Sequence, residues 1–300
     1  MNGVPSSTYF TVSPEWGWLI TLYFFFGGLA GGAYFLAALI DFLGQPEDRP
    51  LARLGYYISF PCIIVSGVLL VVDLYRPLRF WHMLIESNTF QPMFKYWSPM
   101  SVGTWALLIF GIFSFLSFLG ALAESNRLRW SAAGRLRPPG AIAKVIAMVG
   151  GLCGFYVAGY TGVLLAVTNR PIWSDTPLLG MLFVVSAAST SAALMILLAQ
   201  RAAWAMPGLA ALHRMELCVL GLELIVLIAV VISLGPVLHA WLNLWGLLLG
   251  TIIVLGMLFP IVLNWRQNWL GDLNITATAA LVLIGGFLLR IVIVFSAEGV

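Results

Sequence analysis

The sequence predicts an all-α integral membrane protein with eight transmembrane helices. Of its 300 residues, 61% are hydrophobic and only 9% are charged, whereas a soluble domain has about 45–50% and about 25% on these two measures. Because so few polar side chains cannot cover a globule in water, most of the surface must face lipid. This composition excludes a cytosolic enzyme, a nucleic-acid-binding protein and a disordered scaffold.

The apolar runs give the number of spans. A helix needs about 20 residues to cross the hydrocarbon core, and it satisfies its own backbone hydrogen bonds, as lipid requires. The predicted spans are 17–43, 51–73, 99–123, 141–167, 177–200, 214–235, 238–263 and 274–297. The break at Gly235-Pro236 is weak, so the sixth and seventh spans could instead form one long helix, which would reduce the count to seven.

The first span carries a repeated stripe of small residues, Gly27, Gly28, Gly31 and Gly32. Small residues four positions apart let the backbone of a neighbouring helix approach closely. We therefore expect the first span to lie inside the bundle.

The distribution of Lys and Arg predicts the orientation, because cytoplasmic loops carry the excess of basic residues. The connections after the odd-numbered spans hold Arg49, Arg53, Arg127, Arg129, Arg135, Arg137, Lys144, Arg201, Arg214 and Arg266, and the opposite side holds Arg76, Arg79, Lys95 and Arg170. The first side is therefore predicted to be cytoplasmic, and both termini face outward, to the periplasm of a Gram-negative bacterium. Met1 to Pro14 contain no basic residue, so we expect no cleaved signal peptide.

The longest outward loop, 74–98, is rich in aromatic residues. It contains Phe80, Trp81, Phe90, Phe94, Tyr96 and Trp97. Such residues form an aromatic belt at the membrane interface, or they provide a docking surface for a partner outside the membrane. The sequence leaves both interpretations open.

Four charged residues lie within or at the end of a span, where they mark a pathway or a buried pair. Glu223 is near the middle of the sixth span, Glu216 precedes it on the same helical face, Arg290 is inside the eighth, and Asp73 ends the second. They favour either a proton route or a charge pair of Arg290 with Glu223 or Asp73. Other carboxylates, among them Asp41 and Glu124, are expected to be solvated at the cytoplasmic ends.

Histidine and cysteine placement argues against a metal or haem centre in this protein. A transmembrane haem held by two imidazoles needs facing histidines within helices, but His82, His213 and His239 all lie near span ends. We expect each to be solvated at the interface. The three cysteines show no CxxC spacing, so neither a zinc site nor a disulfide framework is expected.

Two tyrosines lie at similar depth beneath the predicted outer face. By the helical rise, Tyr23 is about 9 Å and Tyr160 about 10 Å inside their spans. Trp16 is on the same helical face as Tyr23, and Trp18 and Glu15 are close by. Aromatic walls with phenolic donors suit a flat, lipid-soluble ligand with carbonyl oxygens, such as a quinone. By composition alone, an interfacial aromatic belt is the better explanation of these residues, because Tyr and Trp concentrate at membrane interfaces.

An ordered set of motifs resembles the NrfD/PsrC family, the membrane subunits of molybdopterin oxidoreductase complexes such as polysulfide reductase. The motifs are Trp16-Gly17-Trp18, Tyr23 to Gly32 (YFFFGGLAGG), Asp73 to Trp81, Trp97 to Gly103, and Tyr160 to Leu165 running on to Asn169 to Trp173. The resemblance is dense from about residue 15 to 185 and only hydropathic beyond.

The resemblance implies an architecture and a set of partners. It implies two four-helix bundles, 17–167 and 168–300, which follow the N-terminal segment 1–16 that the basic residues already place outward. It also implies a site for menaquinone or ubiquinone near the outer face, with no haem or metal in this protein. A ferredoxin-type iron–sulfur subunit and a molybdopterin catalytic subunit would dock on that face.

The resemblance also assigns site residues. The quinone-contacting phenol of the family falls on Tyr160, and Tyr23 takes the place of a histidine in the first span. An asparagine one turn before that histidine becomes Ile20 here. These departures leave the proton acceptor open between Glu15 and Asp73.

The leading hypothesis is a membrane subunit of a quinone-dependent oxidoreductase, whose redox centres lie in partner subunits. Tyr23 and Tyr160 would bind the quinone, Trp16 and Trp18 would shape the pocket, and Asp73 or Glu15 would exchange protons. One alternative is a proton-translocating or transport subunit that uses Glu216, Glu223 and Arg290. Another is a passive membrane anchor. The terminal substrate and the direction of electron flow stay open.

Overall fold

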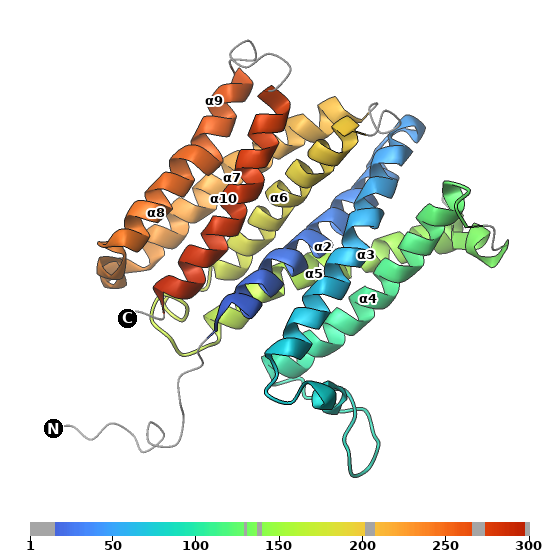
Figure 1. Cartoon of the computed structure of the whole chain (residues 1–300), viewed down its shortest axis with the longest axis horizontal. Helices are drawn as coiled ribbons and strands as arrows, with labels where there is room; N and C mark the ends of the chain where they lie inside the picture. The colour runs from blue at the N-terminus through green and yellow to red at the C-terminus, as the bar shows by residue number, and fades with distance from the viewer. Residues whose placement is uncertain (1–15, 129–130, 137–139, 202–207, 266–273, 298–300) are drawn as a thin grey trace.

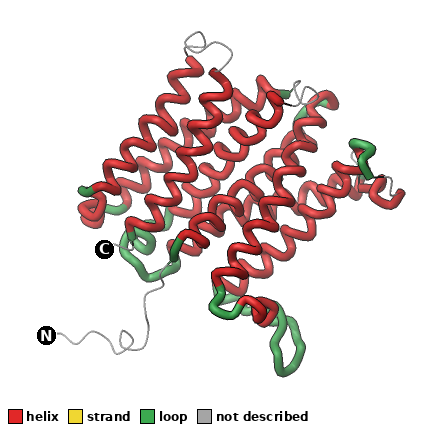
Figure 2. Tube along the Cα trace, in the orientation of Figure 1, coloured by secondary structure: helices red, strands yellow, loops and turns green. Residues whose placement is uncertain are grey.

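The computed structural model describes residues 16–128, 131–136, 140–201, 208–265 and 274–297. These residues form eight helices that are long and apolar enough to cross a membrane, as predicted. They are α2 (Trp18–Leu43), α3 (Arg49–Asp73), α4 (Pro99–Glu124), α5 (Ala141–Ala166), α6 (Leu179–Arg201), α7 (Leu209–Ser233), a seventh span that starts with α8 (Leu244–Ile252) and ends with α9 (Phe259–Trp265), and α10 (Asn274–Ser296). Short loops join most of them, and the longest described loop lies between α3 and α4 (Figure 2).

Successive spans run in opposite directions, so the helix ends gather on two sides. We call the side where α2 begins and α3 ends the Trp18 end, and the opposite side the Asp41 end. The end of α10 lies on the same side as the start of α2 (Figure 1). The α3–α4 loop, with the 3-10 helix η2 (Pro77–Met83), therefore lies at the Trp18 end.

Helix α2 lies at the centre of the packing and contacts α3, α5, α6 and α10. Its glycines make this possible. A Cβ atom at Gly31 would lie 2.3 Å from the carbonyl oxygen of Gly154 in α5, and one at Gly32 would lie 2.5 Å from that of Ala187 in α6. The stripe therefore brings two neighbours close to one helix, and the prediction that the first span is internal is confirmed. Because α2 and α5 both pack on α6, the division at residue 167 stays a prediction.

The weak break between the sixth and seventh spans is a real turn. Helix α7 ends at Ser233, and the 3-10 helix η5 (Gly235–Trp241) follows. Gly235 has a φ of +50°, a left-handed conformation that glycine adopts at little cost. Asn243 then accepts a hydrogen bond from the backbone N–H of Trp245 and starts α8. The eight-span interpretation is therefore confirmed over the seven-span one.

The seventh span is not a uniform α-helix, a feature that the sequence pattern did not predict. A π-helical segment, η6 (Ile253–Leu258), separates α8 from α9. Pro260 follows it, and a proline inside a helix lacks an N–H and clashes with the preceding turn, so local widening accommodates it. At the same level Gly256 meets Gly285 of α10, where a Cβ atom on either residue would lie within 3 Å of the other's Cα.

Candidate functional site

Helices α2, α3, α4 and α5 surround a cavity of about 690 Å³ that reaches toward the Trp18 end. Most of its lining is apolar, with a small number of polar side chains. This volume falls within the range of about 300–1,000 Å³ of small-molecule sites, which are mostly apolar with a few orienting polar groups. The cavity contains four of the predicted site residues: Trp16, Tyr23, Tyr160 and Asp73.

Tyr160 is held against the first turn of α4. Its hydroxyl donates a hydrogen bond of 2.7 Å to the carbonyl oxygen of Pro99. Gly103 makes room for the ring, because a Cβ atom there would lie 2.1 Å from the Tyr160 hydroxyl oxygen. The Ser98 side chain caps α4 by accepting from the N–H of Ser101. The Trp97-to-Gly103 motif therefore holds the Tyr160 phenol in position.

Tyr23 reaches the same cavity from α2 and is buried. Tyr160 lines the same cavity from α5. The prediction of matched depth thus places both phenols in one site. Asp73, the last residue of α3, lies at the exposed mouth of the cavity.

Of the two tryptophans predicted to shape the site, only one lines the cavity. Trp16 lines the cavity and stacks on Trp173, with ring centroids 5.2 Å apart. Trp18 is 57% exposed and packs instead against Phe295 of α10, with centroids 4.8 Å apart, and it does not line the cavity. Glu15 lies outside the described residues.

Arg290 and Glu223 lie away from the cavity, buried among α2, α6, α7 and α10. Ser189 donates to the Glu223 carboxylate at 2.5 Å. The Arg290 Nη1 atom donates to the Ser186 hydroxyl at 3.2 Å and to the carbonyl oxygen of Gly286 at 2.7 Å. No ion pair of Arg290 within 4.0 Å is found among the described residues, but it interacts electrostatically with Glu223. Two serines on adjacent turns of α6 therefore stand between the charges.

Glu216 lies at the Asp41 end of α7 and is fully buried. Its carboxylate is 3.1 Å from the Nδ1 atom of His213, whose side chain is only 17% exposed. The expectation that His213 is simply solvated was therefore wrong, because it pairs with a carboxylate one turn away. His239 is exposed, and His82 is partly exposed.

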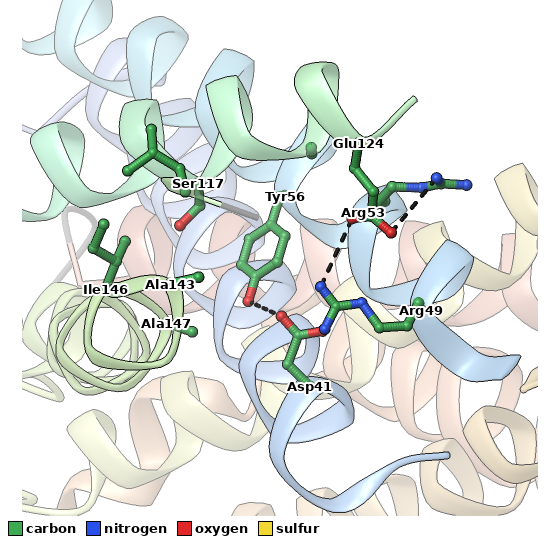
Figure 3. A pocket seen from close by; sticks show the side chains of 11 residues that line it. Asp41, Arg49, Arg53, Tyr56, Ser117, Glu124, Ala143, Ile146 and Ala147 are labelled. Carbon is green, nitrogen blue, oxygen red and sulfur yellow. Dashed lines mark hydrogen bonds and ion pairs between the residues drawn. The ribbon is translucent and has the colours of Figure 1, made fainter. Parts of the chain in front are cut away.

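A second polar group, at the Asp41 end, was not predicted. Asp41 was expected to be solvated, but its side chain is only 6% exposed, and it pairs with Arg49 at 3.3 Å. Tyr56 donates to the other carboxylate oxygen of Asp41 at 2.7 Å. Arg49 and Arg53 both reach Glu124 of α4 (Figure 3). The only signal in the sequence was the four-residue spacing of the two arginines.

The described residues hold no group of three or more His, Cys, Asp or Glu side chains placed to bind a metal ion. The polar side chains that line the cavity are the phenols of Tyr23 and Tyr160, the carboxylate of Asp73, the hydroxyl of Thr104 and the indole of Trp16.

Comparison with known proteins identifies the family. The family described as "Polysulphide reductase, NrfD" matches residues 8–299. The chain belongs to this family. The assignment made from the ordered motifs is thus confirmed, and it extends over the part of the sequence where the resemblance was only hydropathic. Together with the eight apolar helices, it makes the chain a multi-pass membrane protein.

Individual relatives match over different lengths. Protein NrfD of Escherichia coli is 25% identical over 98% of this chain and 98% of its own length. The C component of the polysulfide reductase of Wolinella succinogenes is 31% identical over 58% of this chain but only 55% of its own length. The membrane component of a putative dimethyl sulfoxide reductase of Halobacterium salinarum is 34% identical over 26% of this chain and 18% of its own length.

Proposed function

We propose that this chain is the membrane subunit of an oxidoreductase complex and that the cavity of α2–α5 binds the head group of menaquinone or ubiquinone. The observation that carries the proposal is the convergence of Tyr23 and Tyr160 on one apolar cavity. Two phenols on different helices match the two oxygens of a flat quinone ring, and the apolar walls match its isoprenoid tail.

The hydrogen bond of Tyr160 gives the two phenols different roles. Because the Tyr160 hydroxyl donates to the carbonyl of Pro99, its oxygen is left to accept a hydrogen bond from the ligand. A quinol has an O–H to donate, whereas a quinone has only carbonyl acceptors. Tyr23 would then supply the donor for the opposite oxygen. This arrangement favours binding of the quinol over binding of the quinone.

The reaction moves two electrons and two protons. A quinone accepts both to become a quinol, and the reverse step returns them. Trp16 would shape the pocket, and Asp73 at the mouth, or Glu15 just before the described residues, would exchange protons with water. Trp18 is left out of the site because its ring faces α10.

The electrons would come from or go to a partner. Relatives are named as parts of reductases, so we propose a ferredoxin-type iron–sulfur subunit, joined to a molybdopterin catalytic subunit. The excess of Lys and Arg at the Asp41 end supports a cytoplasmic position for that end, so the Trp18 end would face the periplasm from the bacterial inner membrane. The α3–α4 loop there exposes Tyr75, Phe90, Tyr96 and Trp97, a surface suited to docking.

The test is Tyr160→Phe in the intact complex, with turnover of quinol and binding of a quinone-site inhibitor as readouts. Loss of one ligand hydrogen bond should lower quinol turnover roughly tenfold, the equivalent of about 1.4 kcal/mol. Tyr57→Phe is the matched control, because Tyr57 bonds Ala121 and Ser125 away from the cavity. Unchanged turnover and inhibitor binding in Tyr160→Phe, or a wild-type complex without bound quinone, would instead favour a passive anchor.

A proton-translocating role is a second candidate, supported by the buried group of Glu223, Ser189, Ser186 and Arg290. Ionisable side chains inside a membrane protein are costly, and they either mark ion routes or pair with one another. Glu223→Gln should then abolish proton movement across the membrane while electron transfer continues at its normal rate. Normal proton movement in this variant would leave the residue with a structural role.

A further inference from the structure

Six polar residues of α2, α3 and α4 lie between the Asp41 end and the quinone cavity. We call Asp41, Tyr56, Tyr34, Ser117, Ser114 and Ser59 the hydroxyl column. Tyr34, Ser59, Ser114, Ser117 and Tyr56 are all buried in the described structure. Burying a hydroxyl in an apolar span costs free energy unless it is hydrogen-bonded, and each of these five hydroxyls has a hydrogen-bond partner.

The column starts at the ion pairs of the Asp41 end. Tyr56 donates to Asp41, and both residues line a cavity of about 20 Å³ that also reaches Ser117 (Figure 3). This volume is enough for a single water molecule with polar partners. Asp41 and Ser117 can therefore be joined through one water and the Tyr56 hydroxyl. Arg49, Arg53 and Glu124 line the same cavity and are the charged groups around its entrance.

The middle of the column consists of two hydroxyl pairs on adjacent turns. The Tyr34 and Ser117 hydroxyl oxygens are 2.6 Å apart, and those of Ser59 and Ser114 are 2.9 Å apart. Ser114 precedes Ser117 by one turn of α4, and Ser59 follows Tyr56 by one turn of α3. Residues at that spacing have Cβ atoms about 5–6 Å apart, a gap that one water or a rotation of the hydroxyls spans.

The column ends at Ser59 and Ser114, next to residues that line the quinone cavity. Gly111, one turn beyond Ser114 on α4, lines that cavity, and so do Phe60 and Phe115, the direct sequence neighbours of Ser59 and Ser114. A Cβ atom at Gly111 would meet nothing within 4 Å, so the cavity is open at this position, one turn from the buried Ser114. The hydroxyl column thus runs from the ion pairs of the Asp41 end to the Ser59–Ser114 pair, which directly adjoins residues that line the cavity.

We propose that the hydroxyl column carries protons between the Asp41 end and the quinone cavity. The proposal rests on the proposed function. When the partner's iron–sulfur centre supplies two electrons to the quinone, the two protons that complete the quinol enter from the Asp41 side. When the quinol is oxidised, its two electrons go to that centre and its two protons leave by the same route. Because the electrons arrive at the Trp18 end and the protons at the Asp41 end, the reaction moves charge across most of the membrane.

A purely structural role makes a different prediction. Hydroxyl pairs between transmembrane helices also act as packing contacts, and the Ser59–Ser114 pair alone would be explained in that way. A structural role requires each hydroxyl to be hydrogen-bonded, but it does not require the pairs to be connected along the column. It also has no influence on the side of the membrane from which the quinone takes its protons. Asp73 is the competing route, because it lies at the opposite mouth of the same cavity.

The experiment uses the complete complex in vesicles of phosphatidylethanolamine and phosphatidylglycerol that contain menaquinone, with a pH-sensitive dye in the lumen. The Trp18 end and the partner subunits face outward, and reduced benzyl viologen outside supplies the electrons. Menaquinone reduction is followed by its absorbance. We expect the lumen to become alkaline as menaquinone is reduced, and a protonophore to abolish the change.

The decisive variants change single hydroxyls. Ser114→Ala should slow menaquinone reduction roughly 10²-fold, as expected for the loss of a positioned proton donor, with unchanged menaquinone binding and a larger solvent isotope effect. Ser114→Thr keeps the hydroxyl and should restore the rate. Ser125→Ala is the matched control, since this serine directly follows α4 but bonds Tyr57 outside the column.

Each other outcome is informative. Menaquinone reduction with no change in the lumen, or a normal rate in Ser114→Ala, overturns the column and leaves the proposed function intact. Slowing in Ser114→Ala that Ser114→Thr does not restore also overturns it, because the hydroxyl is then not the group that matters. If the wild-type complex neither binds nor reduces menaquinone, the proposed function itself fails.

Discussion

Trp16 stacks on Trp173, with ring centroids 5.2 Å apart and planes inclined by 30°. Trp173 is fully buried and donates its indole N–H to the carbonyl oxygen of Ile293 at 2.7 Å. The carbonyl belongs to the last turns of α10, whereas Trp16 lines the cavity of α2–α5. The loop between α5 and α6 thus links the end of the last helix to one wall of the α2–α5 cavity.

Replacing Trp173 should therefore affect both stability and the cavity. Trp173→Phe removes the indole N–H and leaves the Ile293 carbonyl without this partner, at a cost of about 1–3 kcal/mol. Thermal unfolding of the protein in detergent should shift downward, and inhibitor binding in the complex should weaken. Trp18→Phe is the control, because Trp18 is exposed and off the cavity. If Trp18→Phe weakened inhibitor binding as much as Trp173→Phe, Trp18 would belong to the site after all.

Gly103 is the residue that allows Tyr160 to reach Pro99. A Cβ atom at this position would overlap the Tyr160 ring and hydroxyl, so Gly103→Ala must displace the phenol. Quinol turnover in the complex should fall about as far as in Tyr160→Phe, roughly tenfold for one lost hydrogen bond. Combining the two variants should cause no further loss, because both remove the same interaction. Additive losses would show that Gly103 acts in another way.

Gly31 tests the packing of α2 on α5. A Cβ atom there would lie 2.3 Å from the carbonyl oxygen of Gly154, and backbone cannot move aside as a side chain can. Gly31→Ala should destabilise the protein by about 1–3 kcal/mol, the usual cost of overpacking. At Gly250 of α8 a Cβ atom meets nothing within 4 Å, so Gly250→Ala should leave thermal unfolding in detergent unchanged or slightly raised. Equal effects of both changes would contradict the close approach.

The number of spans was predictable because the thickness of the membrane imposes a helix length that hydropathy reveals. The residues at which the helices begin and end were less predictable. Helix α7 begins at Leu209, whereas the predicted span begins at 214, because its first turns include the polar residue His213. The π-helical segment before Pro260 was missed because apolar residues mask a change in helical winding.

The site was predictable in depth but not in direction. Counting residues from the span ends placed Tyr23 and Tyr160 at one level, and both reach the same cavity. The same count included Trp18, but five residues along a helix correspond to a rotation of about 140°, so Trp18 points toward α10. The Asp41 group was missed for a related reason. Sequence gives the depth of Asp41 and Glu124, but not that α3 places Arg49 between them.

Arg290 and Glu223 offer a test between a charge pair and a proton route. Removing one charge should leave the other buried and uncompensated, at about 3–5 kcal/mol, so Arg290→Met should strongly lower the unfolding temperature. Adding Glu223→Gln should recover much of this loss, because the remaining carboxylate becomes a neutral amide that still accepts from Ser189. The coupling energy comes from a double-mutant cycle of unfolding free energies. The serines between the two charges make partial rather than complete recovery the expected result. A coupling energy near zero would show that Arg290 does not stabilise Glu223, and the carboxylate would then be a stronger candidate for proton transfer.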